Sequence, residues 1–217
     1  MFIIAIFDTI MIRNIEATSM KQKVLILHGW GGSDYPHWQS WLAGKIARKY
    51  GTVSFPLLDN PHFPSKNRQM KQIKTLLKEF KPDTVICHSL ANIIWFYLCE
   101  EGEITPIKRL LLVCPPSSNC DIKTIKKFFP YKTPQNLFAA ESMLVTSTTD
   151  PYLTQMEADT LQKELNIEMK VLEDAGHINA DSGYGEWPWA WEWVKKGEVK
   201  PSSKVAMTGE RLKETKK

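Results

Sequence analysis

Short apolar segments alternate with helical patterns through most of this chain, and this alternation restricts the fold more than any other feature. Six segments of four to six residues are largely apolar, without regular polar alternation. Such segments are typical of strands that are buried on both faces. They cover residues 24–27, 52–55, 84–87, 109–114, 143–146 and 169–172.

Helical periodicity lies between these segments. The clearest case follows Ser65, a candidate N-cap, where apolar residues at 70, 73, 76, 77 and 80 recur at helical spacing. Further helices are predicted over 38–50, ended by Gly51, over 90–101, ended by Gly102, and over 154–165. This order predicts an α/β fold: a mostly parallel six-stranded sheet with helices on both faces, in a single domain without internal repeats.

The composition agrees with one globular domain. The 217 residues are 43% hydrophobic and 24% charged, which excludes a disordered or collagen-like chain. No apolar run reaches the ~20 residues that a membrane-spanning helix needs, so stable membrane insertion is not expected. The 4 cysteines form no C-x-x-C pair and no zinc-type spacing. We therefore expect reduced thiols and a cytoplasmic location.

The two ends differ from the rest of the chain. Residues 1–22 form an N-terminal extension whose apolar start lacks a basic leader, and we expect translation to begin at Met20. Residues 195–217 carry eight Lys or Arg against three Glu, which leaves the other residues at about −1. The positive charge thus lies on a polar tail, predicted to be disordered over 197–217, and nucleic-acid binding is not expected. The folded domain is expected over 23–196.

Polar residues directly after the predicted strands are the candidates for chemistry, because ligands gather at the carboxyl ends of parallel strands. The third strand runs through Cys87-His88-Ser89-Leu90-Ala91-Asn92 into a helix. A serine on such a tight turn projects its hydroxyl above the sheet. The usual pattern is G-x-S-x-G, and here Cys87 and Ala91 replace the glycines. Taken alone, this motif favours Ser89 as a simple cap of the helix over a catalytic serine.

Two further strands end in polar residues that complete a triad. Asp150 follows the fifth strand, where Asp-Pro is also an ordinary turn opener, and His177 lies in the loop after the sixth. Together with Ser89 they give the chain order Ser, Asp, His of an α/β-hydrolase. Histidine can take the proton of the serine hydroxyl, and a carboxylate can hold the imidazole in the correct tautomer. The sequence therefore predicts these three side chains at one edge of the sheet.

A nucleophile of this kind also needs hydrogen-bond donors for the developing oxyanion. We expect one from the backbone N–H of Leu90, next to the serine, and one from Trp30 in the glycine-rich loop after the first strand. That loop fails as a nucleotide cradle, because Asp34 replaces a required glycine and no G-K-[ST] follows. The five histidines form no H-E-x-x-H pair, so no metal and no cofactor are expected.

Several longer motifs resemble a known group of small α/β-hydrolases, the retinoblastoma-binding protein nine family and its YdeN-like bacterial relatives. The resemblance covers about residues 23–196 and rests on VLILHGWGGS, CHSLAN, LLLVCPP, SMLVTSTTDPY and, most specifically, DAGHINADSGYGEWP. It implies a serine hydrolase with Ser89 as nucleophile, Asp150 as acid, His177 as base and a minimal cap. Cys87 and Ala91 depart from the family pattern and put rate and substrate fit in doubt.

The function predicted from these features is hydrolysis of small acyl esters through an acyl-enzyme. Two alternatives stay open: a binding module that keeps the scaffold with negligible turnover, and a peptidase acting on small amides. Glu173, Asp174 and Asp181 also compete with Asp150 for the histidine. Residues 115–140 are either a pocket wall or a crossover helix with loops. In the final helix, tryptophans 187 and 191 share one face and 189 and 193 another, so one pair is expected to pack on the sheet.

Overall fold

The computed structural model describes residues 22–197. The predicted extension 1–22 and tail 197–217, apart from residues 22 and 197 themselves, lie outside the described residues. Within 22–197, no helix is long and apolar enough to cross a membrane.

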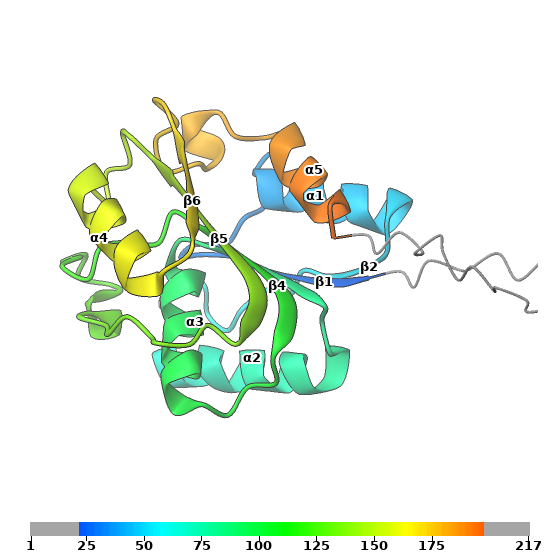
Figure 1. The fold of residues 1–217 in the computed structure, drawn as a ribbon, viewed down its shortest axis with the longest axis horizontal. Coiled ribbons are helices and arrows are strands. Elements are labelled where there is room, and N and C mark those ends of the chain that lie inside the picture. The colour runs from blue at the N-terminus through cyan, green and yellow to red at the C-terminus, as the bar shows by residue number, and fades with distance from the viewer. Residues whose placement is uncertain (1–21, 198–217) are drawn as a thin grey trace, which may run out of the picture. The chain divides into compact units, whose positions relative to one another are not determined.

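Six parallel strands form one sheet in the order β2-β1-β3-β4-β5-β6, and five α-helices cover it on both sides (Figure 1). The predicted α/β class with a mostly parallel six-stranded sheet is confirmed. The strands are β1 Lys23–Leu27, β2 Thr52–Ser54, β3 Thr84–His88, β4 Ile107–Val113, β5 Ala139–Ser147 and β6 Glu168–Leu172. The helices are α1 Trp38–Lys49, α2 Lys66–Phe80, α3 Leu90–Glu101, α4 Gln155–Leu165 and α5 Pro188–Lys195.

Each central strand is buried on both faces, as its unbroken apolar sequence predicts. In β1, Leu25 and Leu27 belong to the core on one side, which also contains residues of α2, α3 and α4. Val24 and Ile26 pack with α1 and α5 on the other side. The period of two along the strand thus supplies two separate cores, and each helix that connects two parallel strands packs on one face or the other.

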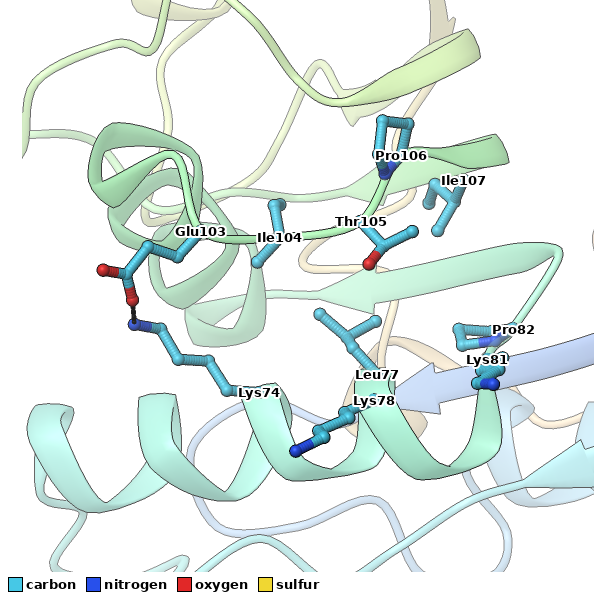
Figure 2. Close-up of a pocket in the computed structure, with 10 residues that line it drawn as sticks. All are labelled: Lys74, Leu77, Lys78, Lys81, Pro82, Glu103, Ile104, Thr105, Pro106 and Ile107. Carbon is cyan, nitrogen blue, oxygen red and sulfur yellow. Dashed lines mark hydrogen bonds and ion pairs between the residues drawn. The ribbon is translucent and has the colours of Figure 1, made fainter.

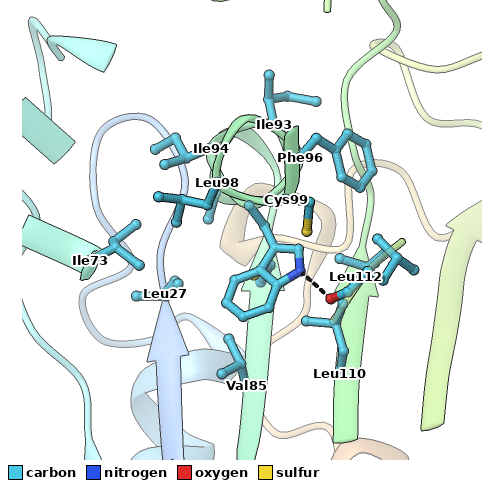
Figure 3. Close-up of a cluster of buried hydrophobic side chains, with 14 of the residues drawn as sticks. Leu27, Ile73, Val85, Ile93, Ile94, Phe96, Leu98, Cys99, Leu110 and Leu112 are labelled. Carbon is cyan, nitrogen blue, oxygen red and sulfur yellow. Dashed lines mark hydrogen bonds between the residues drawn. The ribbon is translucent and has the colours of Figure 1, made fainter. Parts of the chain in front are cut away.

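Helix α3 is the most buried helix, because it runs across the middle of the sheet. Nine of its 12 residues are buried. Figure 3 shows some of them, such as Ile94 and Leu98, in one cluster with strand residues such as Val85 and Leu110. The Trp95 indole N–H donates to the carbonyl of Leu137 at 3.2 Å, so the one polar atom of this ring is satisfied. The amino end of α3 therefore has a rigid support on the sheet.

The helix boundaries follow the capping residues read from the sequence. Helix α3 ends at Gly102, which is left-handed with φ 69°, and α4 begins after Thr154 in a reciprocal capping box with Glu157. Ser65 is the N-cap residue of α2, but its side chain makes no capping hydrogen bond. Strand β5 begins four residues earlier than expected, because backbone pairing with β4 continues through the small and polar residues at its start.

The structure removes one of the two alternatives for residues 115–140, and the expected pairing of tryptophans is wrong. The β4–β5 connection holds no crossover α-helix within its described residues, only a 3₁₀ turn over Lys126–Phe128; prolines 115, 116, 130 and 134 interrupt the segment. In α5 the buried tryptophans are Trp187 and Trp193, which are not a same-face pair. Trp187 is the N-cap residue with non-helical dihedrals, so the helical spacing rule does not apply to it.

Candidate active site

Ser89 lies in the sharp turn between β3 and α3, at the carboxyl edge of the sheet. Its backbone has φ 54° and ψ −125°, a conformation that a residue with a Cβ adopts only under constraint. The Ser89 N–H donates to the carbonyl of Val113 at 2.9 Å. The buried Asn92 amide donates to the carbonyls of Ser89 and Val113, each at 2.8 Å. These bonds hold the turn against strand β4 and fix the direction of the serine hydroxyl.

Small residues on both sides let the chain turn this tightly. Cys87 and Ala91 are completely buried in the core beneath the turn. The elbow conformation therefore forms with cysteine and alanine in the places where glycine is usual. The sequence analysis assigned no role to Asn92, the last residue of the Cys87–Asn92 motif. Its place in the first turn of an apolar helix was a signal, because a buried amide requires a polar partner.

Asp150 and His177 come together from the loops after β5 and β6. Both carboxylate oxygens of Asp150 lie near His177 Nδ1, at 2.9 and 3.0 Å. Nε2 of the same ring lies 2.9 Å from Ser89 Oγ. The three predicted side chains therefore form one continuous hydrogen-bonded chain from carboxylate to hydroxyl, and the competing acids Glu173, Asp174 and Asp181 do not take part in it.

Three consecutive hydroxyl groups fasten the aspartate loop to the histidine loop. Ser147 Oγ accepts the N–H of Ala175 at 3.0 Å. Thr148 Oγ1 accepts the N–H of Asp174 at 3.0 Å, and Thr149 Oγ1 accepts the N–H of Gly176 at 3.1 Å. Sequence reasoning gave these residues no role, although a run of hydroxyl residues directly before an aspartate could have suggested it. The run sets the separation of the two loops, and with it the carboxylate–imidazole contact.

His88 contacts both the backbone and the ring of His177. Its Nε2–H donates to the carbonyl oxygen of His177 at 3.0 Å, and the two rings lie 5.1 Å apart. Tyr152 stands on another side of the His177 ring, edge-on at 4.6 Å. His88 was expected to pack or to orient a loop, and this hydrogen bond agrees with that expectation.

Buried neutral imidazoles surround the triad. Burial lowers the pKa of His88 well below its usual value and lowers that of His28. Burial, with a smaller effect of His177, lowers the pKa of His37 to about 4. His28 and His37 hold the loop and helix that follow β1: His28 Nε2 accepts the N–H of Leu58 at 2.8 Å, and His37 Nδ1 accepts that of Gln39 at 3.1 Å.

These lowered pKa values predict an acid-labile fold. A histidine with a folded pKa near 4 takes up its proton more readily in the unfolded chain, so stability is full above about pH 6.5 and declines toward pH 4. Each such imidazole contributes up to about 1.4 kcal/mol per pH unit. Urea unfolding at pH 7.5, 6.0 and 5.0 measures the decline. His37→Asn keeps an acceptor for the helix cap and should lessen the slope; equal stability at pH 7.5 and 5.0 would contradict the prediction.

The glycine-rich loop after β1 lies directly against the serine. A Cβ at Gly29 would come 2.6 Å from Ser89 Cβ and 3.2 Å from Ser89 Oγ. The loop is held from the other side as well, since the Gly31 N–H donates to the carbonyl of Pro61 at 2.9 Å and the Trp30 indole donates to that of His62 at 2.9 Å. The predicted oxyanion loop therefore touches the predicted nucleophile through the hydrogen atom of a glycine.

Gly29→Ala should disturb the site more than the fold. The added methyl group must push the loop and Ser89 apart, and displacements of this order can cost about 10²-fold in rate. We expect a 10- to 100-fold slower reaction with a serine-directed phosphonylating reagent. Gly44→Ala on α1 is the matched control, because its Cβ would meet only the flexible end of Arg48 at 3.5 Å. Equal reaction rates in both variants would contradict the contact.

The backbone N–H groups of Leu90 and Trp30 are the predicted donors to an oxyanion. Leu90 is the first residue of α3, where N–H groups lack intrahelical acceptors. The Trp30 N–H meets no acceptor among residues 22–197. Gly31 and Gly32 donate to the carbonyls of Pro61 and Gly29, so these two N–H groups are already engaged.

A metal is poorly suited to the side chains at the triad. Ligand atoms of Cys114, Asp150 and His177 lie within 4.8 Å of one another. However, the Asp150 carboxylate already contacts the His177 nitrogen that faces it. Burial, together with the nearby carboxylate, raises the pKa of the Cys114 thiol well above its usual value, so the thiolate that a metal needs is disfavoured.

Two hollows meet at Ser89 and His177. Trp30, Asn179 and Asp181 line both of them. One, of about 230 Å³, is otherwise lined mainly by apolar residues of the β4–β5 connection; the other, of about 290 Å³, is lined by the glycine loop, Asp34 and His37. A further hollow, of about 480 Å³, lies elsewhere, between α2 and the loop before β4 (Figure 2). It is at the amino ends of the strands, away from the polar residues described above.

Comparison with known proteins agrees with this arrangement. Curated proteins include no match to the chain. Among solved structures, the ydeN gene product of B. subtilis superposes with a TM-score of 0.69 at 15% identity, covering 81% of this chain and 97% of the other. A putative YdeN-like hydrolase from Pectobacterium atrosepticum gives 0.64 at 20%, covering 81% and 90%. The esterase domain of a Rhodothermus marinus protein gives 0.58 at 14%, covering 82% and 88%.

These structural likenesses show the fold, which is that of α/β-hydrolases. The profile of the family described as "Serine hydrolase" matches residues 24–196, most of the chain and all six strands but the first residue of β1. The resemblance read from the sequence motifs is thereby confirmed at the level of the serine hydrolase family, and the likeness to the YdeN structures is one of fold. The chain belongs to the serine hydrolase family and has the α/β-hydrolase fold.

Proposed function

We propose that this protein is a carboxylesterase that cleaves small acyl esters through an acyl-enzyme formed on Ser89. The observation that carries the proposal is the 2.9 Å contact between Ser89 Oγ and His177 Nε2, with the Asp150 carboxylate on the opposite ring nitrogen. In that arrangement the imidazole Nδ1 carries a proton toward Asp150, and Nε2 is free to accept the proton of the hydroxyl.

The first half-reaction transfers the acyl group to the serine. Ser89 Oγ attacks the ester carbonyl while its proton passes to His177 Nε2. The carbonyl oxygen becomes an oxyanion, held by the N–H groups of Trp30 and Leu90, each worth about 10²- to 10³-fold in rate. The C–O bond to the alcohol then breaks, and His177 returns the proton to the departing oxygen. Asp150 stabilises the imidazolium throughout.

The second half-reaction releases the acid. A water molecule attacks the acyl-enzyme, His177 takes one of its protons, and Ser89 recovers that proton as the acid leaves. All groups that these steps require are side chains or backbone N–H groups of this chain. The serine hydrolase family supports a small-molecule substrate, and the ester preference rests on the open site together with the esterase named among the structural relatives.

Chemical trapping of the serine tests the mechanism. A fluorophosphonate should label the folded protein once, and peptide mass spectrometry should place the adduct on Ser89. Heat-denatured protein, in which the proton acceptor is dispersed, should stay unlabelled. An adduct on another residue, or none on the folded protein, would refute the assignment and favour a binding module on a hydrolase scaffold. Comparing p-nitrophenyl esters with amino-acid anilides then separates an esterase from a small-amide peptidase.

The four cysteines fit the proposed cytoplasmic location. Cys87, Cys99, Cys114 and Cys120 are all free thiols, and the first three are buried. Burial raises the pKa of Cys87 well above its usual value and that of Cys99 to about 12, so these two thiols are inert.

A further inference from the structure

The hollow on the glycine-loop side of Ser89 contains donors and acceptors that the ester chemistry does not use. Asp34 and Asp181 are exposed carboxylates at its rim, and neither has an ion-pair partner among residues 22–197. The residues that line it include no lysine and no arginine. Such a surface repels carboxylate or phosphate groups and offers acceptors to O–H or N–H donors.

His37 supplies a hydrogen-bond donor in the same hollow. The side chain is only 6% exposed, and its Nδ1 accepts the N–H of Gln39. A neutral imidazole with an accepting Nδ1 carries its proton on Nε2. That N–H has no partner among the described residues, and it is the one ring atom left to meet an occupant of the hollow. The buried Ser33 hydroxyl, which also lines the hollow, is likewise unpartnered in this part of the chain.

The opposite hollow has a different character. Apart from the residues that it shares with the first hollow, Asn179 and Asp181 among them, it is lined mainly by apolar side chains: Pro116, Ile122, Ile125 and Tyr152. Its volume of about 230 Å³ suits a short hydrocarbon chain. A substrate that spans Ser89 therefore meets more apolar side chains on one side of its carbonyl, and Asp34, His37 and the glycine loop on the other.

From this pairing, and resting on the esterase function above, we propose that the substrates are short-chain acyl esters of a polyhydroxy alcohol. The acyl chain enters the apolar hollow, and the alcohol enters the hollow of Asp34, His37 and Asp181. A hydroxyl group both donates and accepts, so it satisfies the carboxylates and the His37 N–H at once. An ammonium group has no acceptor and would leave the His37 N–H without a partner.

Three butyrate esters that differ only in the alcohol test the proposal. They are glyceryl monobutyrate, propyl butyrate, which lacks the two free hydroxyls, and butyrylcholine, which is cationic. A site built to bind hydroxyls discriminates strongly against analogues that lack them, and here the rim is partly exposed. We expect kcat/KM for the glyceryl ester to exceed that for the propyl ester about tenfold or more. A ratio near one would overturn the proposal.

Substitutions assign the preference to named groups. His37→Asn keeps an acceptor for the helix cap while removing the Nε2–H, and it should reduce the glyceryl-to-propyl ratio about fivefold. Asp34→Asn and Asp181→Asn should each reduce the glyceryl-to-propyl ratio about two- to fivefold, because interactions of solvent-exposed charged groups are weak. Glu79→Gln, on the exposed face of α2, is the matched control and should not change the ratio.

The outcomes separate this proposal from the mechanism beneath it. If the fluorophosphonate labels Ser89 but the glyceryl preference is absent or insensitive to His37→Asn, the polyol assignment fails and the esterase stands. A preference for butyrylcholine that Asp34→Asn and Asp181→Asn remove would instead assign the hollow to a cation and overturn the proposal. As a readout without turnover, glycerol should slow labelling of the wild type more than 1-propanol does; equal effects would also overturn it.

Discussion

Replacing Ser89 by alanine should lower kcat for a small ester about 10⁶-fold, with the fold preserved. The nucleophile and its proton acceptor act as a unit, so removing the hydroxyl removes nearly all of the triad's contribution and leaves only substrate binding and oxyanion stabilisation. Alanine keeps the Cβ and tolerates the backbone φ of 54° as well as serine does, and no capping bond is lost, because the Ser89 hydroxyl does not cap α3. The rate is measured with p-nitrophenyl acetate at saturating concentration.

Ser142→Ala is the matched control for that loss. Ser142 lies in the first half of β5, away from the carboxyl edge of the sheet, and the same loss of one hydroxyl should leave kcat within twofold. Thermal unfolding of both variants checks that the structure persists. A Ser89→Ala enzyme that retains more than about 1% of the wild-type kcat would show that the serine is not the nucleophile.

Asp150→Asn should lower kcat about 10⁴-fold. Both carboxylate oxygens face His177 Nδ1, and the aspartate side chain is completely buried. An amide that donates its N–H to Nδ1 would place the imidazole proton on Nε2, where it faces the serine and prevents proton transfer. The Asp150 backbone and its turn should hold, although the N–H of Tyr152 loses a charged acceptor at 2.9 Å. The rate is measured on the same ester.

Asp174→Asn isolates this effect from a general loss of negative charge. Asp174 lies in the histidine loop with φ 50°, a left-handed conformation that asparagine also accepts. Its N–H, which bonds Thr148, is unaffected by the side-chain change. We expect kcat within threefold of the wild type. A comparable fall in both variants would mean that charge near the loop, and not the orientation of the imidazole, accounts for the effect of Asp150.

Most of the fold was predictable from the sequence, because strands buried on both faces leave a local record. The unbroken apolar segments, the helical spacing after Ser65 and the stop at Gly102 each depend on neighbouring residues alone. Prediction failed where local pattern and tertiary context diverge. The start of β5, Ala-Ala-Glu-Ser, lacks the large apolar side chains of a buried strand and becomes a strand by pairing with β4. The alternation of tryptophans near the C-terminal end of the domain did not reveal that the helix begins after Trp187.

The residues of the triad could be predicted from the sequence for a similar reason. Ser89, Asp150 and His177 each directly follow a strand or lie in the loop after one, and parallel strands deliver such residues to one edge. The residues that hold the triad in place could not be predicted in this way. The three hydroxyls before Asp150, the amide of Asn92 and the N–H of His88 act on partners that are distant in sequence, and nothing in a local pattern names those partners.

By itself, then, the sequence determined the succession of strands and helices along the chain, since this follows from short-range periodicity. It also determined which residues reach the carboxyl edge of the sheet, because parallel strands all end there. Only the tertiary structure decided the distances within the triad, the contact of Gly29 with Ser89 and the contrast between the two hollows. Those properties arise where separate loops meet, and the packing of the whole domain sets the spacing of loops that share no local sequence.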